Sequence, residues 1–334
     1  MTHVCVVGAG AWGTAIANLV AARAIVTLWV HGNDTLLTLR EARENSLYLP
    51  GIRLRDNVEP TDDLMGAWHS ADAIILAVPT QRLRSMFHKL APELRRPGVP
   101  LLNLSKGLEL ETHLRVSQLL CEDLKLSDYD HYAVLSGPNF APEIARNMPA
   151  ATVIASRAPG MRRYFQELLS GGSLRAYTST DLAGVELGGA LKNIYAVAAG
   201  VCDGLGFGDS SKASLIVRSL HELVKVATVL GANPVTIYGL AGAGDLIATS
   251  FSRLSRNRMA GEAIGRGAPA SELQNGQRSV IEGLPTLEAL AKIAELSSID
   301  LPVVHQLHEI VTGSVTPLVG VQRLMSRVLK NEFQ

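Results

Sequence analysis

Three glycines, Gly8, Gly10 and Gly13, stand between an apolar run at residues 4–7 and a helix-like run at residues 14–22. In that position the first glycine permits a tight turn, the second lets the backbone approach a ligand, and the third lets a helix pack closely on a strand. The helix N-terminus also offers free N–H groups to phosphates. The motif predicts a strand–turn–helix unit that binds the pyrophosphate of a dinucleotide. The alternative is a Gly-rich turn in an α/β protein that binds no nucleotide.

The rest of the chain divides into two parts with different patterns of apolar residues. Up to residue 180, further short apolar runs alternate with helix-like stretches, and the runs are continuous, as in strands buried on both faces. After residue 181 long Ala/Leu-rich segments follow without strand-like runs. We therefore predict a Rossmann-type doubly wound parallel sheet over residues 1–180 and an all-α substrate-binding and catalytic domain over residues 181–334. The expected strands are 4–7, 25–30, 73–78, 101–104, 132–135 and 151–155, and the expected long helices are 182–201, 211–229, 284–294 and 319–330.

Composition excludes several classes of protein. Lys plus Arg and Asp plus Glu both number 31, so no net field recruits nucleic acid or an anionic membrane. No apolar run reaches the roughly 18 residues of a transmembrane helix. The three cysteines are far apart and form no Cys-x-x-Cys pair, so we expect no metal site. The first residues carry no basic or cleavage signal, which favours a cytoplasmic location.

The end of the second predicted strand bears on the choice of cofactor. An NAD-specific site would place Asp or Glu there on the adenosine ribose, but the chain has Val30, His31 and Gly32. Nothing acidic repels a 2′-phosphate, and His31 could donate a hydrogen bond to one, so the sequence favours NADPH over NADH. Alternatively, His31 is a solvated turn residue.

Two lysines and one aspartate are candidates for chemistry. Lys106 follows the predicted strand 101–104, at the edge of the sheet where ligands bind. Lys192 lies inside an apolar helix, where an unused charge would be costly, and its ammonium should pass over Gly188 and Gly189, which leave open space. Asp245 follows a flexible apolar loop and is a plausible partner for an ammonium. The alternatives are a solvated loop lysine, a lysine that reaches the surface, and a helix cap.

A third candidate site lies at residues 253–258. Ser255, Arg256 and Asn257 group a hydroxyl, a guanidinium and an amide at a predicted helix start. Guanidinium forks and helix N-termini both suit a phosphate group. A solvated basic turn is the alternative.

With these residues collected, the chain resembles the NAD(P)-dependent sn-glycerol-3-phosphate dehydrogenase family over nearly its whole length. The resemblance rests on several blocks, which begin with Gly8–Ala15 and the Asn-x-x-Tyr-Leu-Pro-Gly segment Asn45–Gly51. The further blocks are Ser105–Glu109, Gly137–Ala141, Gly189–Asn193, Asp203–Asp209, Gly244–Leu246, Ser255–Arg258 and Val280–Gly283.

The resemblance implies reversible NADPH- or NADH-dependent reduction of dihydroxyacetone phosphate to sn-glycerol 3-phosphate for glycerophospholipid synthesis, by a homodimer. It makes Lys192 the catalytic acid/base, Lys106 a second lysine at the substrate, and Asp245 the carboxylate that positions the site. The implied substrate contacts are Lys106, Gly137, Asn139, Lys192, Asn193, Asp245, Ser255, Arg256 and Asn257. The implied cofactor contacts are Gly8, Gly10, Ala11, Trp12, Gly13, His31, Lys106, Ala141, Arg256, Val280 and Glu282.

The chain departs from the family pattern at three places. Ala11 and Asn139 replace serines, and Ser210-Ser211-Lys212 replaces an Asn-Thr-Arg-like step. Ala11 puts a side-chain phosphate contact in doubt, and Asn139 changes the reach of a polar group. Two other functions stay open: a related hydroxy-acid or hydroxyacyl dehydrogenase, and a dinucleotide-sensing protein without turnover. The basic cluster around Arg256 favours a phosphorylated substrate over the first of these.

Overall fold

A computed structural model describes residues 1–94, 98–125, 129–275, 281–329 and 331–332. Its first half is built on one eight-stranded sheet with the order β3-β2-β1-β4-β5-β6-β7-β8. The sequence order reverses between β1 and β4, as in a doubly wound fold. The strands are β1 (His3–Val7), β2 (Ile25–Trp29), β3 (Val58–Thr61), β4 (Ala73–Leu76), β5 (Leu101–Asn103), β6 (Tyr132–Ser136), β7 (Ala150–Ala155) and β8 (Leu174–Ser179).

All six predicted strands are present, but the sheet is not wholly parallel. The β6 and β7 strands pair antiparallel, whereas every other neighbouring pair is parallel. Between them, the short helix α6 (Ala141–Ala145) packs against α1 (Ala11–Val20) at the carboxyl edge of the sheet. The chain therefore re-enters the sheet from the edge at which β6 ends.

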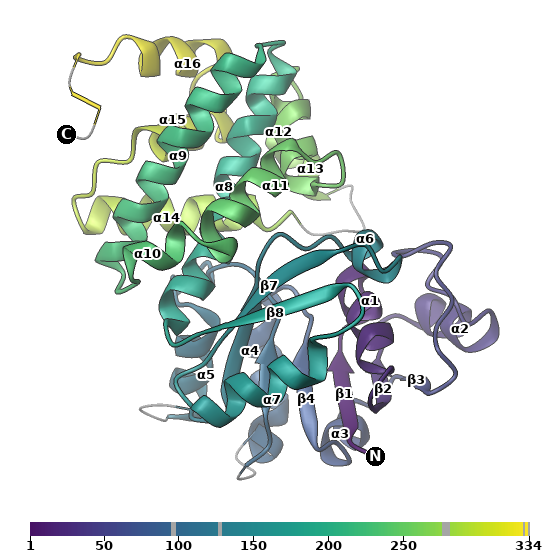
Figure 1. Cartoon of the computed structure of the whole chain (residues 1–334). Helices are drawn as coiled ribbons and strands as arrows, with labels where there is room; N and C mark the ends of the chain where they lie inside the picture. Colours follow the sequence, from purple (N-terminus) through teal and green to yellow (C-terminus); the bar gives the residue numbers. More distant parts are fainter. Residues whose placement is uncertain (95–97, 126–128, 276–280, 330, 333–334) are drawn as a thin grey trace.

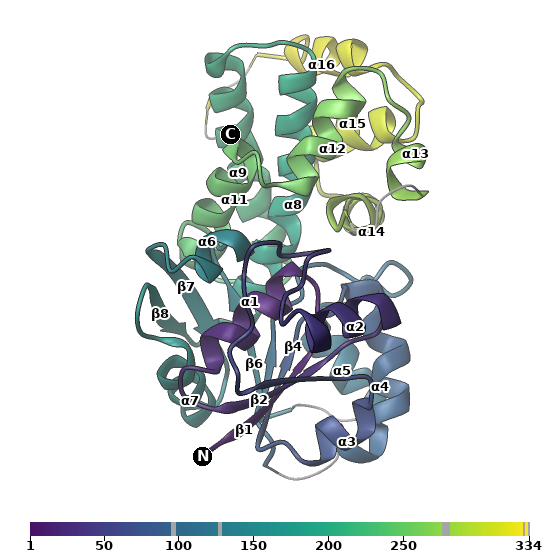
Figure 2. The ribbon, with the colours of Figure 1, turned by 90° about the vertical axis from the view of Figure 1, so that its right-hand side faces the viewer.

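Helices cover both faces of the sheet (Figures 1 and 2). Helices α1, α2 and α7 bury apolar side chains on one face, and α3, α4 and α5 bury them on the other. Strands covered on both faces explain the continuous apolar runs of the sequence. These helices are α2 (Asn33–Glu41), α3 (Leu64–His69), α4 (Thr80–Leu94), α5 (Val116–Leu124) and α7 (Pro159–Leu169).

The second half is helical and surrounds one long helix, α8 (Leu182–Gly204), which begins on the sheet and runs into the helical half (Figure 1). Its first turn is capped by the Asp181 carboxylate, which accepts from Gly184 N at 2.9 Å. The other helices are α9 (Asp209–Val229), α10 (Pro234–Ile237), the π-helical turn η1 (Leu240–Gly244), α11 (Asp245–Phe251), α12 (Arg256–Gly265), α13 (Ala270–Asn275), α14 (Gly283–Leu296), α15 (Pro302–Val311) and α16 (Pro317–Met325).

Glycines bring α8 and α12 into backbone contact. A Cβ atom on Gly200 would collide with Arg258 O, and one on Gly261 would collide with Val197 O. Gly204 and Gly265 extend the same contact by one turn. This close crossing holds α12 against the last two turns of α8, and Asn257 at the start of α12 reaches Asn193, next to Lys192.

Two sequence expectations about helices need correction. The segment before Asp245 is the helical turn η1, with Ala241 and Gly242 buried, and not a flexible loop. Helix α16 ends at Met325, short of the predicted residue 330, which lies outside the described residues. Beyond it Val328 is 90% exposed, so packing does not extend the helix. Among the described helices, none is long and apolar enough to cross a membrane.

Candidate active site

The glycine turn at residues 8–13 has the geometry that the motif predicts. Gly8 has a φ of +111°, which side chains rarely adopt, and a Cβ on Gly13 would collide with the Gly8 carbonyl oxygen. Nothing lies within 4 Å of the Cβ position of Gly10, which is the N-cap of α1. No described side chain caps this helix, so its first N–H groups remain available to an anion.

Beyond the carboxyl ends of β5 and β6, Lys106 and Lys192 bind the same carboxylate. Lys106 Nζ lies 2.6 Å from Asp245 Oδ2, and Lys192 Nζ lies 2.8 Å from Asp245 Oδ1. Lys106 also donates to Gly137 O at 3.1 Å. Residues more than 130 positions apart thus form one cluster, in which Asp245 is 2% and Lys192 is 6% exposed.

Burial and neighbouring charges shift both protonation equilibria. Burial lowers the pKa of Lys192 to about 8, assisted by the positive charges of Lys106 and Arg256 and opposed by Asp245. Burial pushes the pKa of Asp245 upward, but the two ammonium groups outweigh burial and hold this pKa below its usual value. The cluster therefore combines a permanent anion with a lysine that can exchange a proton near neutral pH.

Thr249 is a member of this cluster that the sequence analysis missed. Its hydroxyl accepts from Lys192 Nζ at 2.6 Å and donates to Asp245 Oδ1 at 3.0 Å. It lies one turn after Asp245 on α11, so the two side chains share a helix face. The i, i+4 spacing is the only signal in the sequence, and it is too common to single out a threonine.

The glycines before Lys192 do not leave the open space that the sequence suggested. A Cβ on Gly188 would lie 2.8 Å from Ala241 O, and one on Gly189 would collide with Ser136 Oγ. The close approach is made by η1 and β6 of the same chain. These contacts seat α8 against the strand end that carries Gly137.

The start of α12 combines a helix cap, a side-chain bridge to α8 and an exposed cation. Ser255 is buried and its Oγ accepts from Arg258 N at 3.2 Å, so its hydroxyl serves as the helix cap. Asn257 Nδ2 donates to Asn193 Oδ1 at 2.8 Å, and Asn257 Oδ1 accepts from Gly283 N at 2.9 Å. The Arg256 side chain is exposed at the same helix end. The structure thus brings Asn193, next to Lys192, together with Arg256 and its neighbours.

Glu282 lies just before α14 and reaches the start of α4, whereas Trp12 lies in the first turn of α1. Glu282 Oε1 accepts from Thr80 N at 3.1 Å across the two halves, and burial raises the pKa of Glu282 to about 7. Glu282 Oε2, Thr80 Oγ1 and Trp12 Nε1 are buried without a partner among the described residues. Thr80 Oγ1 and Glu282 Oε2 both face the Cβ position of Gly107, at 2.8 and 3.0 Å. Unpaired buried polar atoms are costly, so these two neighbouring atoms indicate a place for a polar ligand.

The remaining predicted residues are dispersed around the glycine turn and β6. His31 is exposed beyond β2, with its ring 5.7 Å from that of Trp29. Ala141 begins α6 beside α1, and Ala11 lies in the first turn of α1 without a polar side-chain atom. Asn139 Nδ2 donates to Ala151 O at 3.0 Å, while its Oδ1 is buried and unpaired among the described residues. Val280 lies outside the described residues.

The third departure from the family pattern has a structural role. Lys212 Nζ donates to both carboxylate oxygens of Asp203 at 2.8 Å, and Arg258 donates to the same carboxylate. This ion network joins α8, α9 and α12 behind the site. Lys212 therefore braces the helices without reaching the Lys192 cluster.

Fold and site together define a class of two-domain proteins in which a Rossmann-type sheet meets a helical half at a Lys–Asp–Lys cluster. Residues 3–161 match the family described as NAD-dependent glycerol-3-phosphate dehydrogenase N-terminus, and residues 181–322 match its C-terminus. The chain belongs to the NAD-dependent glycerol-3-phosphate dehydrogenase family.

Individual relatives agree over the full length. The chain is 41% identical to glycerol-3-phosphate dehydrogenase [NAD(P)+] of Pelotomaculum thermopropionicum, over 99% of this chain and 95% of that protein. It resembles the crystal structure of glycerol-3-phosphate dehydrogenase from Coxiella burnetii with a TM-score of 0.91 at 31% identity, over 98% and 99% of the two chains. A D-mandelate dehydrogenase structure shares the fold alone, with a TM-score of 0.60 at 14% identity over 93% of this chain and 98% of that one.

Proposed function

We propose that this protein catalyses the reversible NAD(P)H-dependent reduction of dihydroxyacetone phosphate to sn-glycerol 3-phosphate. The observation that carries the proposal is the buried cluster of Lys192, Asp245 and Lys106 at the carboxyl edge of the sheet. The names of the relatives support the same reaction. A role in supplying glycerophospholipid synthesis follows from this product.

The glycine turn and its surroundings fit a dinucleotide. Gly10 leaves room for the pyrophosphate, whereas Gly8 and Gly13 let the turn pack closely on its own chain. Ala11 and Trp12 begin the helix whose N–H groups face the pyrophosphate. We assign the unpaired Glu282 and Trp12 atoms, with Ala141, Val280 and His31, to the remaining cofactor contacts. The NAD(P)H cofactor, when bound, supplies a hydride to the substrate carbonyl carbon.

Lys192 is the proposed acid/base of the reaction. Reduction develops negative charge on the carbonyl oxygen, and a buried ammonium stabilises that charge and then protonates the oxygen. In the reverse direction neutral Lys192 accepts the hydroxyl proton. Asp245 and Thr249 orient the Lys192 amine through direct hydrogen bonds, and Lys106 adds positive potential from the opposite carboxylate oxygen.

The phosphate end of the substrate is assigned to the start of α12. The exposed Arg256 guanidinium and the N–H groups of the helix match a dianion, and anchoring it there fixes the reacting carbon. The full set of proposed substrate contacts is Lys106, Gly137, Asn139, Lys192, Asn193, Asp245, Ser255, Arg256 and Asn257.

Turnover assays separate this function from its rivals. NADPH oxidation is followed with dihydroxyacetone phosphate, with a 2-oxo acid such as pyruvate, and with an acetoacetyl thioester. We expect kcat/KM for the phosphate to exceed the others by about 100-fold, because only it engages Arg256. Higher activity with the acid or the thioester would favour a related dehydrogenase. NADPH binding without turnover of any carbonyl compound would favour a sensing protein.

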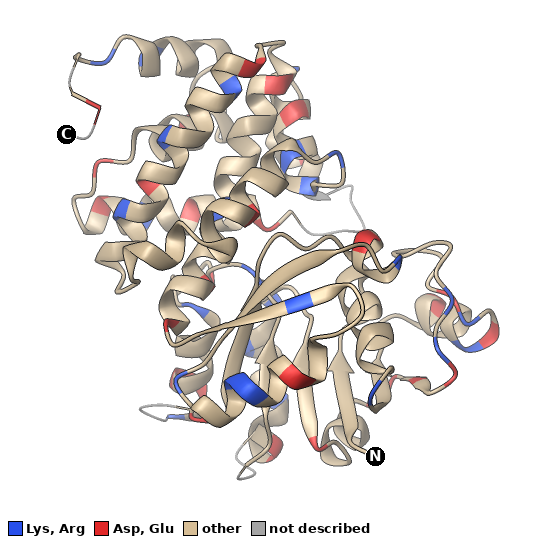
Figure 3. Ribbon diagram, viewed as in Figure 1, with Lys and Arg blue, Asp and Glu red and all other residues tan. Residues whose placement is uncertain are grey.

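Three broader proposals accompany the activity. We place the domain boundary between residues 180 and 181, because α8 begins at Leu182. We propose a homodimer, supported by the exposed apolar side chains Val217, Ile247 and Phe251 on α9 and α11, which sedimentation equilibrium would test. We expect cytoplasmic residence and no nucleic-acid partner. The balanced charges, spread over both halves in Figure 3, support the latter.

A further inference from the structure

The segment Asn45–Gly51 belongs to the family pattern but has no role in the site described above. Asn45 is fully buried beneath the glycine turn. Its Nδ2 donates to Ala9 O and to Thr14 Oγ1, both at 2.8 Å, and its Oδ1 accepts from Tyr48 N at 3.2 Å. A carbonyl acceptor on one side and an N–H donor on the other fix the orientation of this amide.

We infer that Asn45 is a positioning residue that aims the Gly10 N–H at the cofactor pyrophosphate. In a trans peptide the carbonyl and the N–H point in opposite directions, and the described residues contain no cis peptide. Holding Ala9 O therefore turns Gly10 N–H away from Asn45. The Cβ position of Gly10 has nothing within 4 Å, so a ligand can approach the backbone there. The inference rests on the proposed function, because it assumes that a dinucleotide binds at this turn.

The second Asn45 contact extends its effect to the helix that receives the pyrophosphate. Thr14 ends the first turn of α1, where its backbone N donates to Gly10 O at 3.0 Å and its Oγ1 accepts from Asn45. Asn45 thus binds both ends of the segment from Ala9 to Thr14. A single amide holds the turn and the start of the helix in one arrangement, which lowers the ordering cost of binding.

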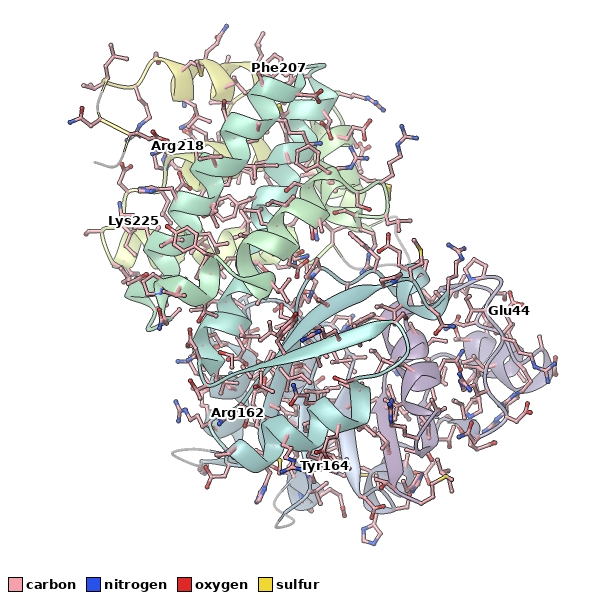
Figure 4. The ribbon with its side chains drawn as sticks, viewed as in Figure 1. Glu44, Arg162, Tyr164, Phe207, Arg218 and Lys225 are labelled. Atoms are coloured by element: carbon pink, nitrogen blue, oxygen red, sulfur yellow. The ribbon has the colours of Figure 1, made fainter. Side chains whose placement is uncertain are left out.

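The segment that carries Asn45 is braced by other contacts. Gly51 N donates to Glu44 Oε1 at 2.9 Å, and Glu44 is labelled at the edge of the sheet domain in Figure 4. Asn18 of α1 donates to Arg53 O at 2.9 Å and accepts from Arg55 N at 3.0 Å. Asn18 therefore holds the same connection to the same helix without touching the glycine turn.

The pair Asn45→Ala and Asn18→Ala tests the inference. The Kd of NADPH is measured by nicotinamide fluorescence, and kcat is measured at saturating NADPH. We expect Asn45→Ala to raise the Kd about tenfold and to change kcat by less than about threefold, because it alters binding and not the reacting atoms. Asn18→Ala should keep the Kd within about twofold of wild type. Equal losses in the two variants would overturn the inference, because they would trace the effect to the connection as a whole.

Two further variants keep the test decisive if Asn45→Ala does not fold. Asn45→Asp keeps the shape and the acceptor for Tyr48 N but faces Ala9 O with an acceptor, so we expect a larger Kd increase than about tenfold. Thr14→Val removes one of the two Nδ2 contacts, and we expect a smaller increase. An Asn45→Asp protein that is folded and binds NADPH like wild type would contradict the inference.

Competition with cofactor fragments locates the effect at the pyrophosphate. ADP-ribose contains the pyrophosphate and adenosine does not. Asn45→Asp should weaken ADP-ribose at least about fivefold more than adenosine. Equal weakening of both would refute the inference. Failure of wild-type protein to bind NADPH would instead refute the proposed function, so the two failures are distinguishable.

Discussion

Lys192 and Asp245 form a buried ion pair across α8 and α11, with Lys192 Nζ 2.8 Å from Asp245 Oδ1. Asp245 also binds Lys106, so one carboxylate faces two ammonium groups. An ion pair buried this deeply is costly to desolvate, and removal of one partner leaves the other charge buried without a counter-charge. The Lys192–Asp245 pair at the junction of the two halves is therefore better explained by a role in catalysis than by a contribution to folding stability.

Replacement of Lys192 tests its catalytic role directly. Lys192→Ala should lower kcat for dihydroxyacetone phosphate by about 100-fold or more, the usual scale for an acid that also stabilises charge. The Kd of NADPH should stay nearly unchanged, because Lys192 is not among the proposed cofactor contacts. A variant that retained more than about a tenth of the wild-type kcat would remove Lys192 from the mechanism.

The lowered pKa of Lys192 predicts opposite pH profiles for the two directions. Reduction requires protonated Lys192, so kcat should fall as pH rises through about 8. Oxidation of glycerol 3-phosphate requires the neutral amine, so kcat should rise through about the same pH. An unshifted lysine would place both transitions near 10.5. The pH dependence of kcat, measured in both directions at saturating substrates, tests this difference. If kcat for reduction fell only near pH 10.5, the pKa of Lys192 would not be lowered.

Thr249→Val tests the hydroxyl that joins Lys192 to Asp245. The ammonium loses an acceptor at 2.6 Å, so the protonated form is less favoured and the pKa of Lys192 falls further. We expect the reductive limb to move about one pH unit lower. Thr249→Ser retains the hydroxyl and is the matched control. If valine and serine gave the same profile, Thr249 would be only a packing residue.

The absence of an acidic residue at positions 30–32 predicts cofactor preference. We expect kcat/KM with NADPH to equal or exceed that with NADH, because nothing there repels a 2′-phosphate and His31 is exposed to meet it. Steady-state kinetics with both cofactors decide the question. A preference for NADH of about tenfold, worth about 1.4 kcal/mol, would mean that another group guards the ribose.

Arg256→Ala tests the assignment of the substrate phosphate. Losing one member of a charged pair typically costs about 2 to 5 kcal/mol, so kcat/KM for dihydroxyacetone phosphate should fall roughly 30-fold to several thousand-fold. The exposed Arg253, three residues earlier, provides the matched control Arg253→Ala. Little change is expected there.

Unphosphorylated dihydroxyacetone distinguishes a phosphate contact from a cofactor contact. A substrate without the phosphate cannot lose an interaction it never made, so Arg256→Ala should affect it at least about tenfold less. Similar losses with both substrates would assign Arg256 to the cofactor or to the fold.

Short sequence patterns predicted the glycine turn and the inner strands of the sheet. The glycine turn was predictable because Gly8 must adopt a φ of +111° and Gly13 must pack without a Cβ. The six inner strands were predictable because burial on both faces leaves continuous apolar runs. The edge strands β3 and β8 were missed: β3 is short and contains Pro60, and β8 alternates buried and exposed residues. The direction of β7 depended on where α6 packs, which no strand pattern records.

The sequence by itself determined that Lys192 is an unusual charge, because a lysine inside an apolar helix requires a reason. It also determined which polar groups the Arg256 segment presents and which family the chain resembles. The tertiary structure alone decided which side chains meet: that Lys106 and Lys192 share Asp245, that Thr249 bridges two of them, and that Asn257 reaches Asn193. The longest of these contacts, between Lys106 and Asp245, joins residues 139 positions apart. The existence of these contacts depends on how α8, α11 and α12 cross, and the glycines at that crossing set a distance that helical periodicity does not encode.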